Sequence, residues 1–159
     1  PLHFRGGAIV PFQYTALTTT EVKENNYYLI VALDGKFIYF IFFIFFSILT
    51  ILKLILLIES GSAQGNLYVD DGESLDLSNH TYISYSALSN ENTGKVTSSG
   101  TYQYTITPVL DKITILGVKS SPSTVSVNGQ QVTFEHKDEH LIISPLQVSM
   151  NKDFVLEWK

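Results

Sequence analysis

The sequence predicts an all-β fold, an antiparallel β-sandwich that is interrupted by one apolar insertion. Short runs of alternating or β-branched residues recur along the chain, turn-forming residues separate these runs, and no segment has a convincing helical pattern. A chain of 159 residues is long enough for one sandwich with a buried core. It is too short for a barrel enzyme of roughly 250 residues.

The expected strands cover residues 27–33, 66–69, 82–88, 102–107, 112–118, 124–127, 131–136, 141–144 and 154–158. Asn128-Gly129 predicts a two-residue hairpin turn, because both central residues of that turn take positive φ. The polar residues 137–139 predict the turn of the next hairpin. Near the start of the chain, Gly6-Gly7 separates two apolar runs and predicts a tight hairpin there.

The insertion is an apolar segment at residues 37–58, which only Ser47, Thr50 and Lys53 interrupt. About 20 apolar residues span a bilayer core, so a helix is the expected form of this segment and a transmembrane helix is one interpretation of it. Lys53 counts against a membrane span, because a charge near the centre of such a helix costs about 2.5 to 3.5 kcal/mol.

The composition of the same segment also predicts an intron that was retained and translated in frame. Codons built only from A and T can encode the whole segment except Ser47 and Thr50, and it contains no Val, Ala or Gly. Gly35-Lys36 can be encoded as G|GT-AAA, which supplies a donor GT, and Ile58-Glu59 as ATA-G|AA, which supplies an acceptor AG. Splicing at these points would remove residues 35–58 and keep a Glu codon at the junction.

Composition argues against several classes of function. The formal charge of −5 and the dispersed basic residues argue against a nucleic-acid partner, since such binding depends on clusters of Lys and Arg. The chain has no cysteine, which excludes disulfides and thiolate metal sites. His136 and His140 are four apart, but that spacing favours metal binding on a helix and these residues are expected in a hairpin. We therefore expect no metal site and no cofactor.

Three ordered motifs resemble the end of glycoside hydrolase family 31 α-glucosidases, in particular the lysosomal and digestive maltase branch. They are PLHFRGGAIVP at residues 1–11, LTTTE at 17–21 and GNLYVDDGES at 65–74. Two later stretches, ITILGV at 113–118 and VSVNG at 125–129, are similar to the last strands of that family. The resemblance covers most of the chain and leaves out the segment from Gly35 to about Ile58.

The resemblance implies two units, the end of a proximal C-terminal β domain at residues 1–25 and a distal C-terminal β-sandwich at 26–159, interrupted by the apolar insertion at 35–58. In this family the catalytic carboxylates lie in a barrel that precedes these domains, so the chain inherits no catalytic residue and is expected to be inactive alone. Its expected partners are the catalytic barrel and the proximal β domain of the same parent polypeptide, with an α-glucoside substrate reached only through the parent. The family also implies a secretory route, to a lysosome or vacuole or outside the cell.

Two groups of residues stand out as candidate sites. Asp70, Asp71, Gly72 and Glu73 predict a structural acidic turn, because neighbouring residues at a strand end point to opposite faces and are poorly placed to share a substrate atom. Contact with a neighbouring domain, or binding of calcium or sugar, are the alternatives for this turn. Asn79 opens the triplet Asn-His-Thr and is a candidate N-glycosylation site.

Two other functions fit parts of the sequence. A free-standing carbohydrate-binding module would use Tyr102 and Tyr104, two apart on one expected strand, as a stacking platform. The simpler interpretation is that both rings pack against the core. A single-pass membrane protein anchored by residues 37–58 would be located in a membrane, but it would place the strands on either side of the anchor on opposite sides of the bilayer.

Overall fold

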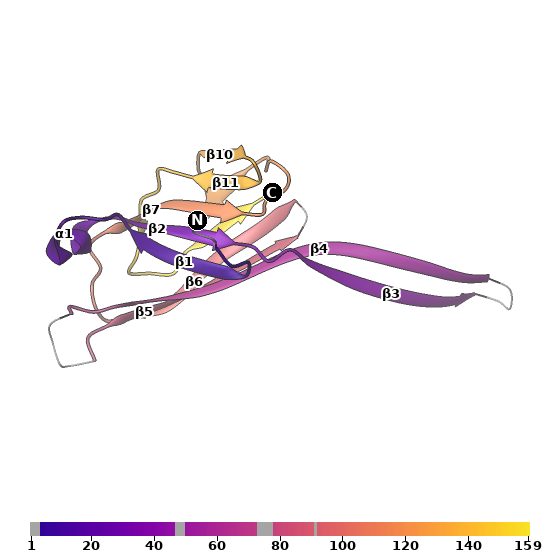
Figure 1. The fold of residues 1–159 in the computed structure, drawn as a ribbon, viewed down its shortest axis with the longest axis horizontal. Coiled ribbons are helices and arrows are strands. Elements are labelled where there is room, and N and C mark those ends of the chain that lie inside the picture. The colour runs from indigo at the N-terminus through magenta and orange to yellow at the C-terminus, as the bar shows by residue number, and fades with distance from the viewer. Residues whose placement is uncertain (1–3, 47–49, 73–77, 91) are drawn as a thin grey trace.

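The computed structural model describes residues 4–46, 50–72, 78–90 and 92–159, with the backbone alone for 36–46 and 50–60. The expected all-β fold is confirmed, and the described residues form one short helix besides their strands (Figure 1). In chain order the elements are β1 (Ala8–Gln13), α1 (Thr19–Glu24), β2 (Tyr27–Ala32), β3 (Lys36–Phe46), β4 (Thr50–Val69), β5 (Thr81–Asn90), β6 (Thr93–Tyr102), β7 (Val109–Leu116), β8 (Val125–Val127), β9 (Gln130–Gln131), β10 (Phe134–Lys137), β11 (His140–Ile143), β12 (Val148–Ser149) and β13 (Val155–Trp158).

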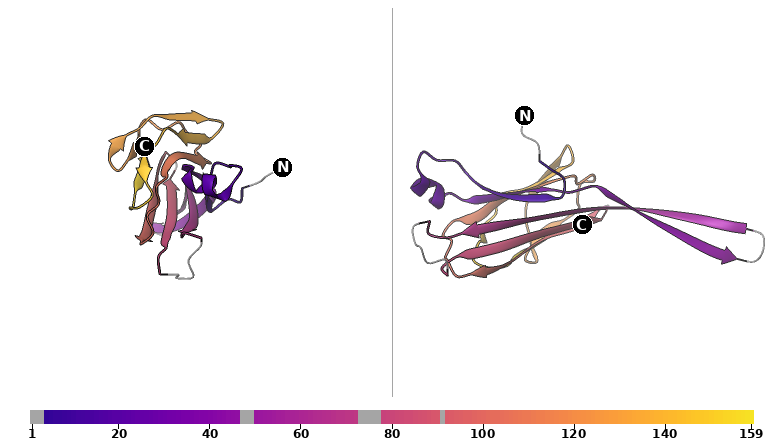
Figure 2. Two further views of the ribbon diagram at one scale, coloured as in Figure 1. Left: turned by 90° about the vertical axis from the view of Figure 1, so that its left-hand side faces the viewer. Right: turned by 60° about the horizontal axis from the view of Figure 1, so that its bottom comes forward.

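The strands form one continuous curled sheet in the order β10-β11-β7-β2-β1-β4-β5-β6-β13-β8-β9. Its first half, β10-β11-β7-β2-β1, lies over its second half, β4-β5-β6-β13-β8-β9, as the end-on view in Figure 2 shows. The expectation of purely antiparallel pairing is wrong at two places, because β2 pairs with β7 and β1 pairs with β4 in parallel. Parallel neighbours need a long crossover, and the chain between β2 and β7 provides it by building β4, β5 and β6 of the other half.

The core lies between the two halves of the sheet. One half contributes buried aliphatic residues such as Leu29 and Ile115, and the other contributes Ile83, Leu156 and Trp158. In β5 the buried and exposed residues alternate from Thr81 to Leu88, as a strand with one face on a core requires. The sequence pattern therefore specifies this central strand directly.

Two glycines allow close approaches between strands. The parallel contact between β1 and β4 is short, with Ala8 opposite Gln64, and a Cβ on the adjacent Gly65 would overlap the carbonyl of Ile9. A Cβ on Gly94 would overlap the indole of Trp158, which lies opposite it in the register of β6 and β13. Both positions need glycine because the space is occupied, one by backbone and the other by the largest core side chain.

The apolar insertion is a long β-hairpin, which corrects the expectation of a helix. β3 pairs with β4 from Lys36 opposite Ser60 to Phe46 opposite Thr50. This arm, defined as β3 with residues 50–59 of β4, projects away from the sandwich (Figure 1). Aromatic and β-branched residues, which favour strands, are frequent in it. In the part of the chain that the structure describes, no helix is long and apolar enough to cross a membrane, so the transmembrane helix is not supported.

The predicted turns have different outcomes. The hairpin at Asn128-Gly129 is confirmed, with φ of 51° and 80°, and it joins β8 to β9. Asp138 and Glu139 turn between β10 and β11 with φ of 51° and 62°, which confirms the polar turn expected there. The hairpin expected around Gly6-Gly7 is not found among the described residues. β1 pairs along its whole length with β2 instead, because the two apolar strands match in register.

Three further elements differ from the sequence prediction. Residues 103–107 are not a strand, since β6 ends at Tyr102. The expected strand at 131–136 is divided between β9 and β10. The helix α1 was not expected, although Thr18 and Glu21 carry its signal: they form a capping box in which each side chain accepts a hydrogen bond from the backbone of the other.

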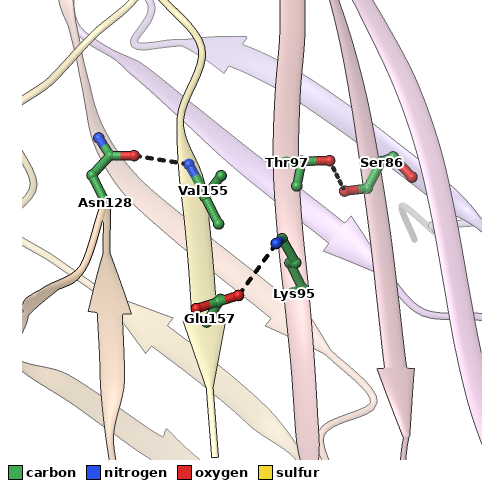
Figure 3. A network of polar contacts seen from close by, with 6 residues as sticks. All are labelled: Ser86, Lys95, Thr97, Asn128, Val155 and Glu157. Carbon is green, nitrogen blue, oxygen red and sulfur yellow. Dashed lines mark hydrogen bonds and ion pairs between the residues drawn. The ribbon is translucent and has the colours of Figure 1, made fainter.

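Side chains connect neighbouring strands at the solvent side of the second half, as Figure 3 shows. Asn128 Oδ1 accepts a hydrogen bond from the backbone N of Val155 at 2.9 Å. Lys95 Nζ lies 3.3 Å from Glu157 Oε1, and both side chains are about half exposed. An exposed ion pair contributes about 0 to 1 kcal/mol, so the Asn128 contact, which joins the β8–β9 turn to β13, is the more consequential of the two.

Candidate functional site

A row of aromatic rings lies on the outer face of β1 and β2. Phe12 and Tyr28 are opposite each other in the register and stack with ring centroids 5.1 Å apart and planes 13° apart. Phe4 meets Phe12 edge to face at 6.1 Å, and Tyr14 meets Tyr28 at 5.1 Å. We call these four residues the aromatic face.

The aromatic face follows from strand alternation. Ile9, Leu29 and Val31 are buried on the inner face, so Phe12 and Tyr28, at odd offsets from them, point outward. Tyr14 is 48% exposed. The nearby Leu17, which precedes α1, is fully exposed. Clustered apolar side chains on a surface are typical of a contact with another protein unit.

A cavity of about 750 Å³ lies at the α1 end of the sandwich. It is bounded by the end of β1, by α1, by the end of β4 and by residues 104–108, and its lining includes Lys23, Tyr27, Tyr68, Asp70 and Tyr104. Two of the residues singled out in the sequence, Asp70 and Tyr104, therefore line the same cavity. This was not predicted, since they belong to separate segments of the chain.

The acidic turn at the edge of this cavity is held by short hydrogen bonds. Asp70 Oδ1 accepts from the backbone N of Gly72 at 2.9 Å, and Gly72 has a φ of 69°. Lys23 Nζ donates to the carbonyl O of Asp71 at 2.6 Å, which ties the turn to α1. Glu73 lies outside the described residues. Asp70 thus fixes the backbone at Gly72, while the structural role of the whole acidic turn stays a prediction.

Tyr68 is an exposed ring beside the acidic turn. It is 48% exposed and stacks on the imidazole of His80 with ring centroids 5.2 Å apart. Its pKa is raised from the ordinary value, first by desolvation and then by the neighbouring Asp70. The phenol is therefore neutral at neutral pH, and Tyr68 is one of the residues that line the cavity.

Tyr102 and Tyr104 do not lie on one strand as the alternative of a stacking platform requires, because β6 ends at Tyr102. Tyr102 donates its hydroxyl to Asp153 Oδ1 at 2.6 Å, and burial followed by this hydrogen bond raises its pKa. Both rings pack partly against the core. The carbonyl O of Tyr104 accepts a hydrogen bond from Thr81 Oγ1 at 2.6 Å.

The remaining candidate residues occupy separate places. Asn79 is exposed in the turn before β5, while Thr81 of the same triplet is buried. His136 Nε2 lies 2.7 Å from the carbonyl O of Val118, and His140 lies on the neighbouring strand β11. Within the ranges that the structure describes, no group of three His, Asp or Glu side chains is arranged to hold a metal ion.

The aromatic face was not predicted from the sequence. Part of its signal was available: Tyr28 lies between the buried Tyr27 and Leu29, yet it is aromatic where a solvent-facing strand position is usually polar. The register between β1 and β2, which brings the two rings together, depends on pairing that the sequence does not display.

Comparisons with known proteins confirm the resemblance expected from the motifs. The chain is 30% identical to glucoamylase 1 of Candida albicans, 31% identical to an α-glucosidase of Schizosaccharomyces pombe and 32% identical to the lysosomal α-glucosidase of Bos taurus. The matches cover 97–99% of this chain and 13–14% of those proteins. The chain thus spans about one seventh of the length of these relatives. No family model matches it.

Two solved structures share the fold. An α-1,4-glucan lyase of Gracilariopsis lemaneiformis superposes with a TM-score of 0.62 at 18% identity, covering 98% of this chain and 16% of that one. A GH31 dextranase of Flavobacterium johnsoniae superposes with a TM-score of 0.66 at 13% identity, covering 98% and 19%. In both, the counterpart of this chain is a small part of a much longer enzyme.

Proposed function

We propose, for a chain that resembles the C-terminal region of family 31 α-glucosidases, that it is an accessory β-sandwich that supports a catalytic barrel in the same parent polypeptide. The observation that carries this proposal is the coverage: almost all of this chain matches about one seventh of each relative. The parent would hydrolyse terminal α-linked glucose, and the sandwich would meet the α-glucoside only through the parent.

The aromatic face is the proposed contact with the rest of the parent. It combines stacked rings at Phe12 and Tyr28 with the half-exposed Tyr14, and it lies on β1, in the segment assigned to the end of the proximal domain. β1 shares a sheet with β2 of the distal sandwich, so a partner seated on this face would touch both units. The domain boundary near residue 25 stays a prediction.

The secretory route is part of the same proposal. One relative is a lysosomal α-glucosidase, and the candidate glycosylation site Asn79 is exposed in a turn, where a glycan would have room. Expression in a secretory host, followed by glycosidase treatment, should shift the electrophoretic mobility of the wild-type chain. The Asn79→Gln variant should show no such shift.

The proposal is tested in the parent enzyme and in the isolated chain. The chain alone should release no p-nitrophenol from p-nitrophenyl α-glucoside above a buffer control. In the parent, Tyr14→Asp should shorten the half-life of thermal inactivation several-fold with KM unchanged, because a charge would be placed in the proposed contact. Leu88→Asp is the matched control, since Leu88 is 65% exposed on β5 away from the aromatic face. Equal half-lives for both variants and the wild type would contradict the proposed contact.

A carbohydrate-binding module is the second candidate. The cavity favours it, because Tyr68 offers an exposed ring beside the carboxylate of Asp70, a combination suited to a sugar face and its hydroxyl groups. Retardation of the chain on a maltose or glycogen column, abolished by Tyr68→Ala, would favour this function. If the chain elutes without retardation, the accessory role is the function that remains supported.

A further inference from the structure

We infer that residues 35–58 are the translation of a retained intron, and that the spliced chain closes the same sandwich through Asp34 and Ser62. This inference is independent of the function proposed above. It rests on the backbone pairing of the arm, on the contacts at its base and on the amino-acid composition of the segment, most of which A- and T-only codons can encode.

The arm and the sandwich meet at a boundary within β4. From Ser60 to Val69 this strand pairs with β5 and belongs to the sandwich. From Thr50 to Ser60 it pairs with β3. In the part of the chain that the structure describes, β3 pairs with β4 alone. Ser60 pairs with both Lys36 and Asn90, so the structural boundary falls at Ser60, next to the position at which the codon argument places the acceptor site.

The other boundary agrees as well. β2 ends at Ala32, and the backbone N of Leu33 still donates to the carbonyl O of Leu116 in β7. Asp34 still hydrogen-bonds to the sandwich through Ser62, whereas the next residue, Gly35, is exposed. The donor site inferred from Gly35-Lys36 therefore lies where the chain leaves the sandwich.

Residues on either side of the segment already hydrogen-bond to each other. The backbone N of Asp34 donates to the carbonyl O of Ser62 at 3.1 Å. Asp34 Oδ1 accepts from the backbone N of Ser62 at 2.6 Å and from its Oγ at 2.9 Å. After removal of residues 35–58, only Glu59, Ser60 and Gly61 remain between them. Connections of this length are common between adjacent strands, so the contact can persist in the shorter chain.

The composition of the arm does not suit either a stable surface ribbon or a designed span. A two-stranded hairpin is marginally stable at best in water, and residues 37–58 are apolar apart from Ser47, Thr50 and Lys53. Selection for packing or for a membrane would be expected to use Val, Ala and Gly, which are absent. Codons made only of A and T account for every residue of the segment except Ser47 and Thr50, without any selection on the protein.

The first test is made on RNA. Reverse transcription of cytoplasmic polyadenylated message across codons 30–66 should give mainly a product that is shorter by the codons of residues 35–58. Its junction should read as a Glu codon between those of Asp34 and Ser60. A message population that keeps these codons throughout would overturn the inference.

The second test is made on the protein. The chain lacking residues 35–58 should fold with a Tm equal to or above that of the full chain and with a higher soluble yield. In the shortened chain, Asp34→Ala should lower Tm by about 5 °C, because two donors of Ser62 lose a charged acceptor. Glu24→Ala, which removes an exposed carboxylate at the end of α1, is the matched control and should change Tm by less than about 1 °C. A shortened chain that fails to fold, or equal effects of the two substitutions, would overturn the proposed closure.

Discussion

The sandwich and the arm are both β-ladders in one continuous sheet, but they differ in what surrounds each strand. In the sandwich, a strand such as β5 has a partner on both edges and a core against one face. In the arm, β3 has one partner, β4, within the described residues. Hydrogen-bonded pairing alone stabilises a ribbon little, because water competes for the same backbone groups.

This difference separates local propensity from tertiary stabilisation. The arm is rich in strand-forming residues and is nevertheless expected to contribute nothing to the stability of the whole. β6 is the opposite case, since its sequence TGKVTSSGTY has weak strand propensity but lies between β5 and β13. Its neighbours impose the strand that its own sequence does not predict.

The largest effect should come from the core of the sandwich. Trp158 is 1% exposed and covers Gly94 on the neighbouring strand, so Trp158→Ala should reduce the free energy of unfolding by about 3 to 5 kcal/mol. Leu88→Ala, at an exposed position of β5, should change it by less than about 0.5 kcal/mol. Urea denaturation followed by far-ultraviolet circular dichroism measures both. Similar losses would show that the core assignment is wrong.

A second comparison tests the backbone ladders directly. Ser84 lies on the exposed face of β5 between two partner strands, so Ser84→Pro removes ladder hydrogen bonds without disturbing the core and should cost roughly 3 kcal/mol. Ile44→Pro makes the same change in β3 and should leave the unfolding midpoint in urea unchanged. A matching loss at Ile44 would make the arm part of the cooperative unit.

The turn at Asn128 should show a smaller effect with two separable causes. Asn128→Ala loses both the hydrogen bond to Val155 and a residue that tolerates positive φ, and should cost about 2 kcal/mol. Asn128→Gly restores the φ but not the hydrogen bond, and should cost about 1 kcal/mol. Differential scanning calorimetry distinguishes the two. Equal losses would assign the whole effect to the hydrogen bond.

The smallest effect concerns a polar atom within the core. The Tyr85 hydroxyl is buried, and within the described residues it has no hydrogen-bond partner. Tyr85→Phe should therefore raise the free energy of unfolding at pH 7 by up to about 1 kcal/mol, measured by urea denaturation. A loss of about 1 kcal/mol or more would indicate a partner for the hydroxyl, such as a bound water.

The same variant should alter the alkaline limb of the stability curve. Burial, with a smaller effect of Tyr102 and then Tyr27, raises the pKa of Tyr85 above that of an unfolded tyrosine, about 10. Because the folded state disfavours the ionised phenol, this ionisation does not affect stability below about pH 10 and lowers it as the pH rises toward the folded pKa. Above about pH 10 the stability of Tyr85→Phe should fall less steeply than that of the wild type, and parallel curves would contradict this cause.

Much of the fold was predictable because local signals agreed with tertiary packing. Asn128-Gly129 specifies its turn by positive φ, and the alternation in residues 82–88 specifies a half-buried strand. The helix α1 was predictable from Thr18 and Glu21, whose capping-box spacing is present in the sequence. The parallel pairing of β2 with β7 was not, because nothing in either strand identifies so distant a partner.

The candidate site was less predictable than the fold. The turn residues Asp70 and Gly72 stand out in the sequence, and their hydrogen bond is local. The aromatic face and the cavity depend on register and on the position of α1, which are tertiary properties. A helix was predicted for the apolar segment because its length fits a membrane span. Its aromatic and β-branched residues also favour strands, and the segment forms a hairpin by pairing with itself.

Amide hydrogen exchange of the intact, monomeric chain tests most directly the claim that the arm lies outside the cooperative sandwich. We expect amides of β2, β5 and β7 to exchange only through global unfolding, and those of residues 36–46 and 50–59 to exchange within seconds. We also expect the slow amides to keep their rates when residues 35–58 are deleted. Arm amides as protected as those of β5, or sandwich amides that lose their protection on deletion, would contradict it.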